Sequence, residues 1–187
     1  MTKPADIGNT IPHKSMSLPN IRDKKDRLFI NKNERGYNFC NKTTCRYCPL
    51  LNKSGKITYT YTDEVFPTMK NVSCRSSNLI YCITCSVCLI QYVGQTSRRI
   101  QDRFQGHFGD ITRDTKDKCI PQHFNSKNHR GIKDIQITVL EFIKKSPRSP
   151  QAVKIRLRRE SHWTHLLHTL SPNGLNMENP KEFKLKT

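Results

Sequence analysis

Cysteine and histidine residues with the spacing of metal ligands occur in the middle part of this chain. Cys85 and Cys88 are separated by two residues, and His123 and His129 by five. Zinc sites use such pairs because two nearby side chains can fill two corners of one tetrahedron. The four residues therefore predict a structural Zn²⁺ site. The alternative is that the cysteines are unliganded core thiols and the histidines are surface residues.

A second group of cysteines lies upstream. Cys40, Cys45 and Cys48 are close together, and Cys74 is their one remaining partner ahead of the predicted catalytic core. Four thiolates could hold a second structural Zn²⁺ and stabilise a segment with few apolar residues. Because the return to Cys74 is long, the sequence leaves both a zinc site and free thiols open.

A carboxylate falls on the apolar face of a predicted helix. Ser149 and Pro150 are typical of a helix start, and the helix is predicted to run to about Leu170, before a turn signal at 171–174. Glu160 falls on its inward face. That face is predicted to carry Val153, Leu157, Thr164 and Leu167. Burying a carboxylate is costly unless it is paired or binds a metal, so this position of Glu160 requires a partner or a metal ion.

The charge of the chain restricts its partners. Lys and Arg number 33 against 15 Asp and Glu, a formal net charge of +18, and such an excess attracts polyanions. Nucleic acid is the expected partner, and a basic surface without a specific role is the alternative. A membrane surface also fits the charge, but no basic amphipathic helix supports it. Five arginines are predicted to make salt-sensitive phosphate contacts: Arg98, Arg99, Arg156, Arg158 and Arg159.

Localisation follows from what the sequence lacks. No apolar run approaches the roughly 18 residues that a membrane span needs, and the first 20 residues have no signal-peptide core. The expectation is a nuclear or cytoplasmic protein without a membrane partner. In such a protein, eight cysteines favour metal ligation or buried thiols over disulfides.

Three segments have the pattern of β-strands. Residues 78–84 and 91–96 are short runs rich in β-branched and aromatic residues, and they are predicted to pair as a hairpin. Residues 135–143 begin with apolar and polar residues in alternation, the period of a half-buried strand. Cys82 is expected in the core of the first strand, and Cys119 is expected to be unliganded.

A helix is predicted between the hairpin and the third strand, over residues 97–108, with Thr96 or Ser97 as its N-cap. Its inward stripe is Ile100, Phe104 and Phe108. Arg103 and His107 lie one helical turn apart on one face of this helix, so their side chains are expected to act together.

Six residues in this order resemble the pattern of GIY-YIG nucleases. The two half-motifs are Leu79-Ile80-Tyr81, with Leu in place of the first Gly, and Tyr92-Val93-Gly94. The resemblance covers about residues 76–178 and implies these catalytic residues: Tyr81, Tyr92, Arg103, His107, Glu160 and Asn176.

Roles for these residues follow from phosphodiester chemistry. Glu160 would bind one catalytic Mg²⁺ or Mn²⁺. Arg103 would contact the scissile phosphate, and Tyr81 and Tyr92 would orient or deprotonate the attacking water. His107 would share the base or phosphate-binding role, or else cap its helix near the C-terminus. Asn176 would orient the site by hydrogen bonding, or else belong to the turn.

The added cysteines and histidines resemble the endonuclease of Penelope-like retroelements. Cys85 and Cys88 lie between the two half-motifs, and some of these elements carry a similar cysteine cluster upstream. The resemblance implies nicking that leaves a 3′-hydroxyl to prime reverse transcription, with element RNA or a reverse transcriptase as further partners.

The sequence therefore predicts a mixed α/β fold with a small, mainly antiparallel β-sheet flanked by helices. The predicted organisation is a flexible basic linker at 1–36, a cysteine-rich zinc module at 37–75, the endonuclease domain at 76–178 and a basic tail at 179–187. The predicted activity is metal-dependent DNA nicking. The alternative is a catalytically inactive, zinc-containing nucleic-acid-binding module, against which the presence of Glu160 argues.

Overall fold

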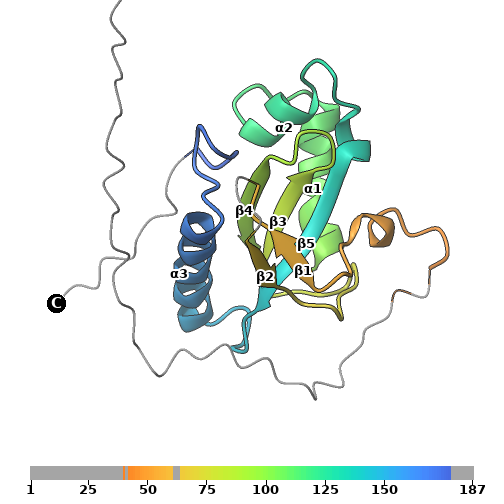
Figure 1. Ribbon diagram of the computed structural model, residues 1–187. Coiled ribbons are helices and arrows are strands. Elements are labelled where there is room, and N and C mark those ends of the chain that lie inside the picture. Colours follow the sequence, from red (N-terminus) through yellow and green to blue (C-terminus); the bar gives the residue numbers. More distant parts are fainter. Residues whose placement is uncertain (1–39, 41, 61–63, 178–187) are drawn as a thin grey trace, which may run out of the picture. The chain divides into compact units, whose positions relative to one another are not determined.

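The computed structural model describes residues 40, 42–60 and 64–177 (Figure 1). The predicted linker at 1–36 and tail at 179–187 lie outside the described residues. No helix within the described ranges has the length and apolar character that a membrane span needs.

A three-stranded antiparallel sheet lies at the centre of the fold. Strand β3 (Leu79–Cys85) pairs with β4 (Gln91–Thr96) on one side and with β5 (Ile135–Phe142) on the other. In the β3–β4 register Tyr81 lies opposite Gly94. The predicted hairpin and the mixed α/β class with a small antiparallel sheet are confirmed.

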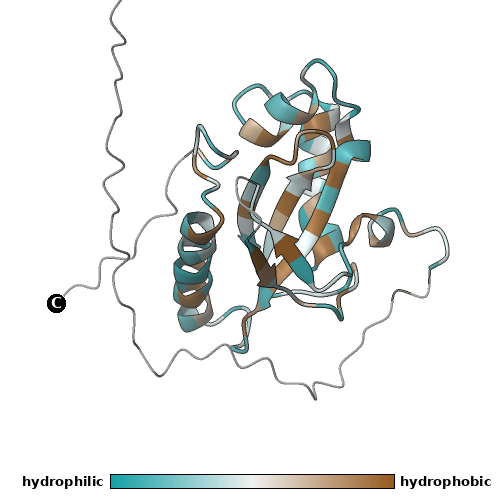
Figure 2. Cartoon of the chain, viewed as in Figure 1, coloured by the Kyte–Doolittle hydropathy of each residue, from teal (hydrophilic) through white to brown (hydrophobic). Residues whose placement is uncertain are grey.

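Both faces of the central strand are covered, and all seven residues of β3 are buried. Leu79, Tyr81 and Ile83 belong to one apolar cluster, and Ile80 and Cys82 belong to another. Since successive side chains of a strand point to opposite faces, the two clusters lie on the two sides of the sheet. Apolar residues accordingly follow the sheet strands in Figure 2.

Two helices cover the face on which Tyr81 lies. They are α1 (Ile100–Thr112) and α2 (Cys119–Phe124), followed by the short 3-10 helix η2 (Gly131–Asp134). These three elements contact one another, and together they cover the apolar cluster that contains Tyr81.

The prediction that the helix of Arg103 begins at Ser97 is wrong. The Thr96 hydroxyl accepts the backbone N–H of Arg98 at 3.0 Å, which holds this stretch in a turn, because a local side-chain bond competes with the helix. The N-cap is Arg99, and the helix continues to Thr112.

The opposite face of the sheet packs against α3 (Pro150–Leu166), which also lies beside β4 (Figure 1). The Ser149 side chain accepts the N–H of Ala152 at 3.1 Å, which confirms the predicted cap. The predicted end near Leu170 is wrong, because the chain leaves the helix after Leu166 and His168 adopts a left-handed φ of 45°.

The inward face of α3 differs from the prediction at Val153, which is 40% exposed. Ala152, Arg156 and Trp163 are buried instead. Arg156 can be buried on this face because its guanidinium finds acceptors in the interior, one of them Asn78 Oδ1 at 2.6 Å.

The cysteine-rich segment lies along the edge of β5 that faces away from β3. It contains the 3-10 helix η1 (Cys48–Leu50) and the paired strands β1 (Lys56–Thr58) and β2 (Val65–Pro67). The backbone N–H of Asn52 donates to the carbonyl of Ile137 at 2.7 Å, so this segment is attached to the central sheet by main-chain bonds.

Candidate active site and metal clusters

The phenol oxygen of Tyr81 is the centre of the candidate active site. Arg103 Nε donates a hydrogen bond to it at 2.9 Å, and His107 Nε2 lies 2.8 Å from it. Arg103 and His107 both come from α1, where a spacing of four residues puts them on one face. Burial raises the pKa of Tyr81, with Arg103 acting in the opposite direction, so the phenol is neutral at physiological pH.

Gly94 makes room for this arrangement. A Cβ at this position would lie 2.7 Å from the Tyr81 hydroxyl oxygen and 2.9 Å from a ring carbon of Tyr92. Both distances are shorter than contacts between real side chains allow. The absence of a side chain at Gly94 therefore lets the Tyr81 ring cross β4 and reach α1.

His107 is nearly enclosed, with 8% of its surface exposed. Burial, followed by the nearby charge of Arg103, lowers its pKa to about 3. Its imidazole is therefore neutral at physiological pH and offers an unprotonated ring nitrogen, although its protonation is unfavourable in the free site. This placement inside α1, in contact with Tyr81, differs from a capping position at the helix end.

Glu160 faces the same site from α3. Burial raises its pKa to about 7, although Arg103 and the backbone N–H of Gln95 act to lower it. Since α1 and α3 pack against opposite faces of the sheet, the charges of Glu160 and Arg103 interact across the edge strand β4. Tyr92 is half-buried on that strand. Burial, followed by the neighbouring Tyr81, raises its pKa, and Glu160 adds to the rise while Arg103 opposes it.

Asn176 holds the edge of β4 in place. Its Oδ1 accepts the N–H of Val93 at 2.9 Å, and its Nδ2 donates to the Val93 carbonyl at 2.8 Å. The amide thus replaces a neighbouring strand at the residue beside Tyr92. Its contacts are with the backbone of β4, so the geometry points to a positioning role.

Cys85, Cys88, His123 and His129 come together as the sequence predicts, with one ligand atom from each within 4.8 Å of all the others. Cys88 Sγ lies 3.5 Å from His123 Nε2 and 3.7 Å from His129 Nε2. A sulfur and a nitrogen bound to one tetrahedral Zn²⁺ are about 3.6 Å apart. The donor set and spacing therefore fit a metal ion.

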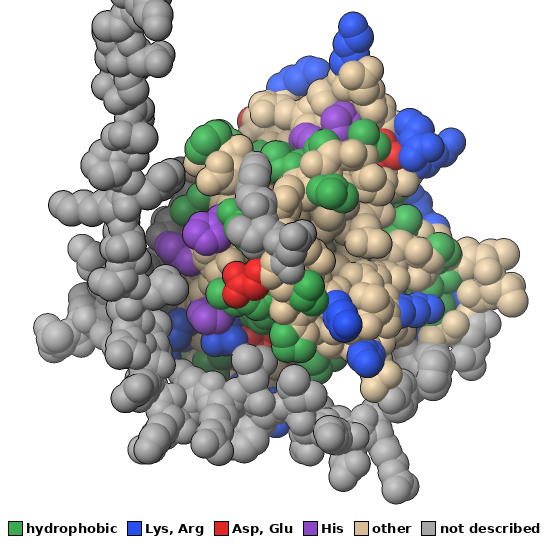
Figure 3. All heavy atoms as spheres, viewed as in Figure 1, with side chains coloured by type: hydrophobic (Ala, Val, Ile, Leu, Met, Phe, Trp, Pro, Cys, Tyr) green, Lys and Arg blue, Asp and Glu red, His purple; other side chains and the backbone are tan. Residues whose placement is uncertain are grey.

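Neighbouring groups orient two of these ligands. His129 Nδ1 lies 3.1 Å from the Ser126 hydroxyl and 3.3 Å from the Lys127 carbonyl, which leaves Nε2 to face Cys88. The N–H of Val87 points at Cys85 Sγ at 3.4 Å, a bond that stabilises a thiolate. Histidine side chains lie close together at the top of the face seen in Figure 3.

The upstream cysteines also converge. Cys40, Cys45, Cys48 and Cys74 each place Sγ within 4.8 Å of the others, so the long return to Cys74 is closed by the fold. At Cys45, burial raises the pKa, but backbone hydrogen bonds from Cys48 and Tyr47 outweigh it and lower the pKa to about 6. A partly ionised thiol among three others suits metal ligation.

Cys82 and Cys119 belong to neither cluster. Cys82 has no exposed surface and packs in the apolar cluster beneath α3. Burial raises the pKa of Cys119, which keeps its thiol protonated.

Two of the five arginines predicted to contact phosphate are placed differently. Arg156 is 4% exposed, and its Nε donates to Gln95 Oε1 at 3.0 Å. Arg159 donates to the Glu141 carboxylate at 2.7 Å. Arg156 therefore ties α3 to β4 one turn before Glu160. The sequence signal was available, since Arg156 precedes Glu160 by four residues on the same helix face.

No protein-family model matches the chain, and no curated protein matches it. Two solved structures are similar over about half of it. A point mutant of the catalytic domain of intron endonuclease I-TevI has 22% identity and a TM-score of 0.44, over 55% of this chain and 94% of that chain. The catalytic domain of homing endonuclease I-TevI has 20% identity and a TM-score of 0.39, over 53% and 96%.

Proposed function

We propose that this protein is a metal-dependent DNA endonuclease of the GIY-YIG type. The observation that carries the proposal is the Tyr81 hydroxyl held between Arg103 and His107, with Glu160 facing them across β4. These four side chains supply a fixed cation, a proton acceptor and a carboxylate within one site. They are the groups that hydrolysis of a phosphodiester requires.

In the proposed reaction, a water oxygen attacks phosphorus and the bond from phosphorus to the 3′ oxygen breaks. The products are a 5′-phosphate and a 3′-hydroxyl, whose oxygen takes its proton from a solvent water. The proton that water loses passes to the Tyr81 hydroxyl, which gives its own proton to His107 Nε2, 2.8 Å away. Tyr92, half-buried at the edge of the sheet, positions the water on the outer side.

Arg103 contacts the phosphate in this proposal. Its guanidinium has five N–H donors, of which the bond to Tyr81 uses one. The remaining donors can bind phosphoryl oxygens, where a charge-assisted bond is strongest. Because Tyr81 also holds the guanidinium, Arg103 is fixed before DNA arrives, and less entropy is lost on binding.

Glu160 is the proposed ligand of one Mg²⁺ or Mn²⁺. When bound, such an ion supplies charge stabilisation to the phosphoryl and departing oxygens. A pKa of about 7 leaves Glu160 about half ionised at neutral pH, so a divalent cation would displace its proton. The two cysteine-containing clusters are proposed as structural Zn²⁺ sites, because thiolate and imidazole ligands suit that ion.

The finer proposal is an origin in a Penelope-like retroelement, with the 3′-hydroxyl priming reverse transcription. It is supported by the cluster of Cys85, Cys88, His123 and His129, which joins residues on both sides of the second half-motif. Element RNA and a reverse transcriptase would then be partners. Extension of the nicked strand by an added reverse transcriptase on an RNA template tests it, and a nick that cannot be extended would oppose it.

The nuclease proposal is tested on supercoiled plasmid with and without Mg²⁺ or Mn²⁺. The unmutated protein should nick, and Glu160→Ala should abolish nicking while leaving DNA affinity equal or higher, because a carboxylate repels phosphate. Asp117→Ala is the matched control, since Asp117 is an exposed carboxylate outside the site. A protein that binds DNA but never nicks it would instead be the inactive binding module.

A further inference from the structure

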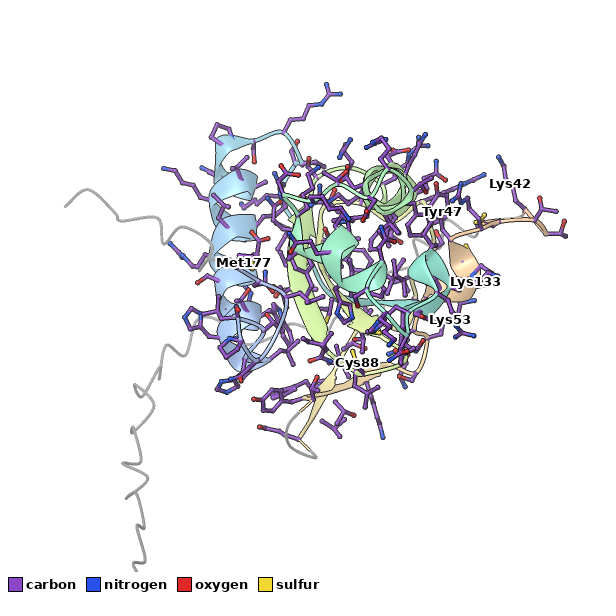
Figure 4. All side chains as sticks on the ribbon, turned by 90° about the horizontal axis from the view of Figure 1, so that it is seen from above. Lys42, Tyr47, Lys53, Cys88, Lys133 and Met177 are labelled. Carbon is purple, nitrogen blue, oxygen red and sulfur yellow. The ribbon has the colours of Figure 1, made fainter. Side chains whose placement is uncertain are left out.

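A cleft with four cationic side chains lies beside the upstream cysteine cluster. Its volume is about 490 Å³, and its lining includes Cys40, Cys45 and Cys74. The cations are Lys42, Arg46, Arg75 and Arg99, and we call this site the cationic cleft. Figure 4 shows Lys42 and Tyr47, both lining residues, at one side of the molecule and Cys88 of the other metal cluster well apart from them.

The walls of the cationic cleft are held by main-chain bonds. The backbone N–H of Gln101 donates to the carbonyl of Cys74 at 2.9 Å, and that of Ile100 donates to the carbonyl of Ser76 at 2.8 Å. These bonds dock the loop that carries Arg75 on the first turn of α1. The cleft is therefore attached to the helix that carries the active site.

Aromatic stacking orients Arg46. Its guanidinium carbon lies 5.5 Å from the Tyr47 ring centroid and 5.2 Å from that of Phe108, and these two rings stack on each other with centroids 5.5 Å apart. Cation–π contacts hold a guanidinium in place without neutralising its charge. Arg46 is thus ordered and keeps its capacity to bind an anion.

Positive charge in the cleft is only partly compensated. Arg99 pairs with Asp102 at 2.8 Å, whereas Lys42, Arg46 and Arg75 make no ion pair with any carboxylate in the described ranges. Four thiolates around the proposed Zn²⁺ would carry a formal charge of about −2, which these three cations exceed. An excess of fixed positive charge in a concave site favours a polyanion.

The cationic cleft lies next to the candidate active site along α1. Arg99 precedes Arg103 by four residues, one helical turn, which is about 6 Å along the axis. One strand of duplex DNA rises about 3.4 Å per phosphate along the duplex axis, so that separation corresponds to at most about two phosphates. We propose that the cationic cleft binds the DNA phosphate backbone within about two nucleotides of the scissile phosphate. This inference rests on the proposed nuclease function.

The test measures duplex DNA affinity of the full chain at several salt concentrations, in buffer without added divalent ions so that no strand is cut. Each phosphate contact contributes about 0.9 to the slope of log K against log salt. The double variant Lys42→Ala, Arg46→Ala should lower that slope by about 2 and weaken binding several-fold at 0.1 M salt, a concentration on the order of physiological ionic strength. Arg46→Lys should retain the slope, because it keeps the charge.

Lys133→Ala is the matched control. Lys133 is exposed on η2, which contacts the far end of α1, since Gly131 lies near Ile111. This variant should leave the slope unchanged. Zinc content and thermal melting of every variant establish that the cysteine cluster has remained intact.

The outcomes separate this inference from the function. A slope that is equal in the double variant and the unmutated protein overturns the proposal that the cationic cleft binds DNA, even where plasmid is nicked. A reduced slope supports the cleft, even where the unmutated protein never nicks and the nuclease proposal fails. An equal loss of slope in Lys133→Ala also overturns it, because the effect would then belong to net charge.

Discussion

Replacing Glu160 by Gln should stabilise the protein at neutral pH while abolishing nicking. The substitution keeps the shape of the side chain and removes the charge. The pKa of Glu160 rises from its ordinary 4.5 to about 7, with burial as the largest cause. A buried carboxylate whose ionised form is disfavoured destabilises the folded protein, and a neutral amide does not.

The magnitude follows from linkage. Below pH 4.5 the carboxyl is protonated in both the folded and the unfolded protein, so its ionisation costs nothing. As the pH rises toward 7, the unfolded protein ionises first, and folding loses about 1.4 kcal/mol for each pKa unit. A rise of about 2.5 units therefore gives at most about 3 kcal/mol, reduced by solvent screening to about 1–3 kcal/mol.

The assay is urea unfolding of the unmutated and Glu160→Gln proteins at pH 5 and pH 8, without added divalent ions. The difference in free energy of unfolding should grow between the two pH values in favour of the variant. Subtracting one protein from the other cancels shared titrations such as that of His107. Mn²⁺ should then stabilise only the unmutated protein, because binding to the folded state shifts the equilibrium.

A difference that is equal at pH 5 and pH 8 would refute the reasoning about burial of Glu160. Equal stabilisation of both proteins by Mn²⁺ would refute its assignment as the ligand. Nicking that survives in Glu160→Gln would place the metal elsewhere.

Three further substitutions test the supporting geometry. Gly94→Ala should destabilise the protein by about 1–3 kcal/mol and abolish nicking, since its Cβ would displace the Tyr81 hydroxyl. Thermal melting and the plasmid assay measure the two effects, and an unchanged melting temperature with full nicking would contradict this. Asn176→Ala should cost about 2–4 kcal/mol, because both backbone groups of Val93 lose their partner; urea unfolding measures it. Cys88→Ser should lower zinc, by elemental analysis, from about two ions per chain to about one.

Much of the fold could be predicted from local pattern. The β3–β4 hairpin follows from two short runs of β-formers, and the Ser149 cap follows from one side chain and the residue after it. The convergence of Cys85 and Cys88 with His123 and His129 could be predicted because the spacing of metal ligands is itself the signal. In each case, the determining interactions lie close in sequence or repeat a fixed spacing.

Long-range contacts account for what could not be predicted. The spacing of Arg156 to Glu160 places it on the inward helix face, but its acceptors could not be predicted, because they lie 61 and 78 positions away, at Gln95 and Asn78. The start of α1 also depends on such contacts. Two carbonyls of the loop at 74–76 accept the first helical N–H groups, in place of the predicted cap at Thr96 or Ser97.

Both proposed metal clusters are connected to the candidate active site through α1. The upstream cluster meets its first turn, where the carbonyl of Cys74 accepts the N–H of Gln101. The other cluster includes His123 on α2, which packs against α1. Arg103 and His107 lie between these two attachments. If each cluster holds the proposed Zn²⁺, loss of either ion should shift both side chains relative to Tyr81. We therefore expect the clusters to affect the proposed nicking without taking part in its chemistry. This distinguishes them from Glu160, whose replacement should remove activity and leave the fold more stable.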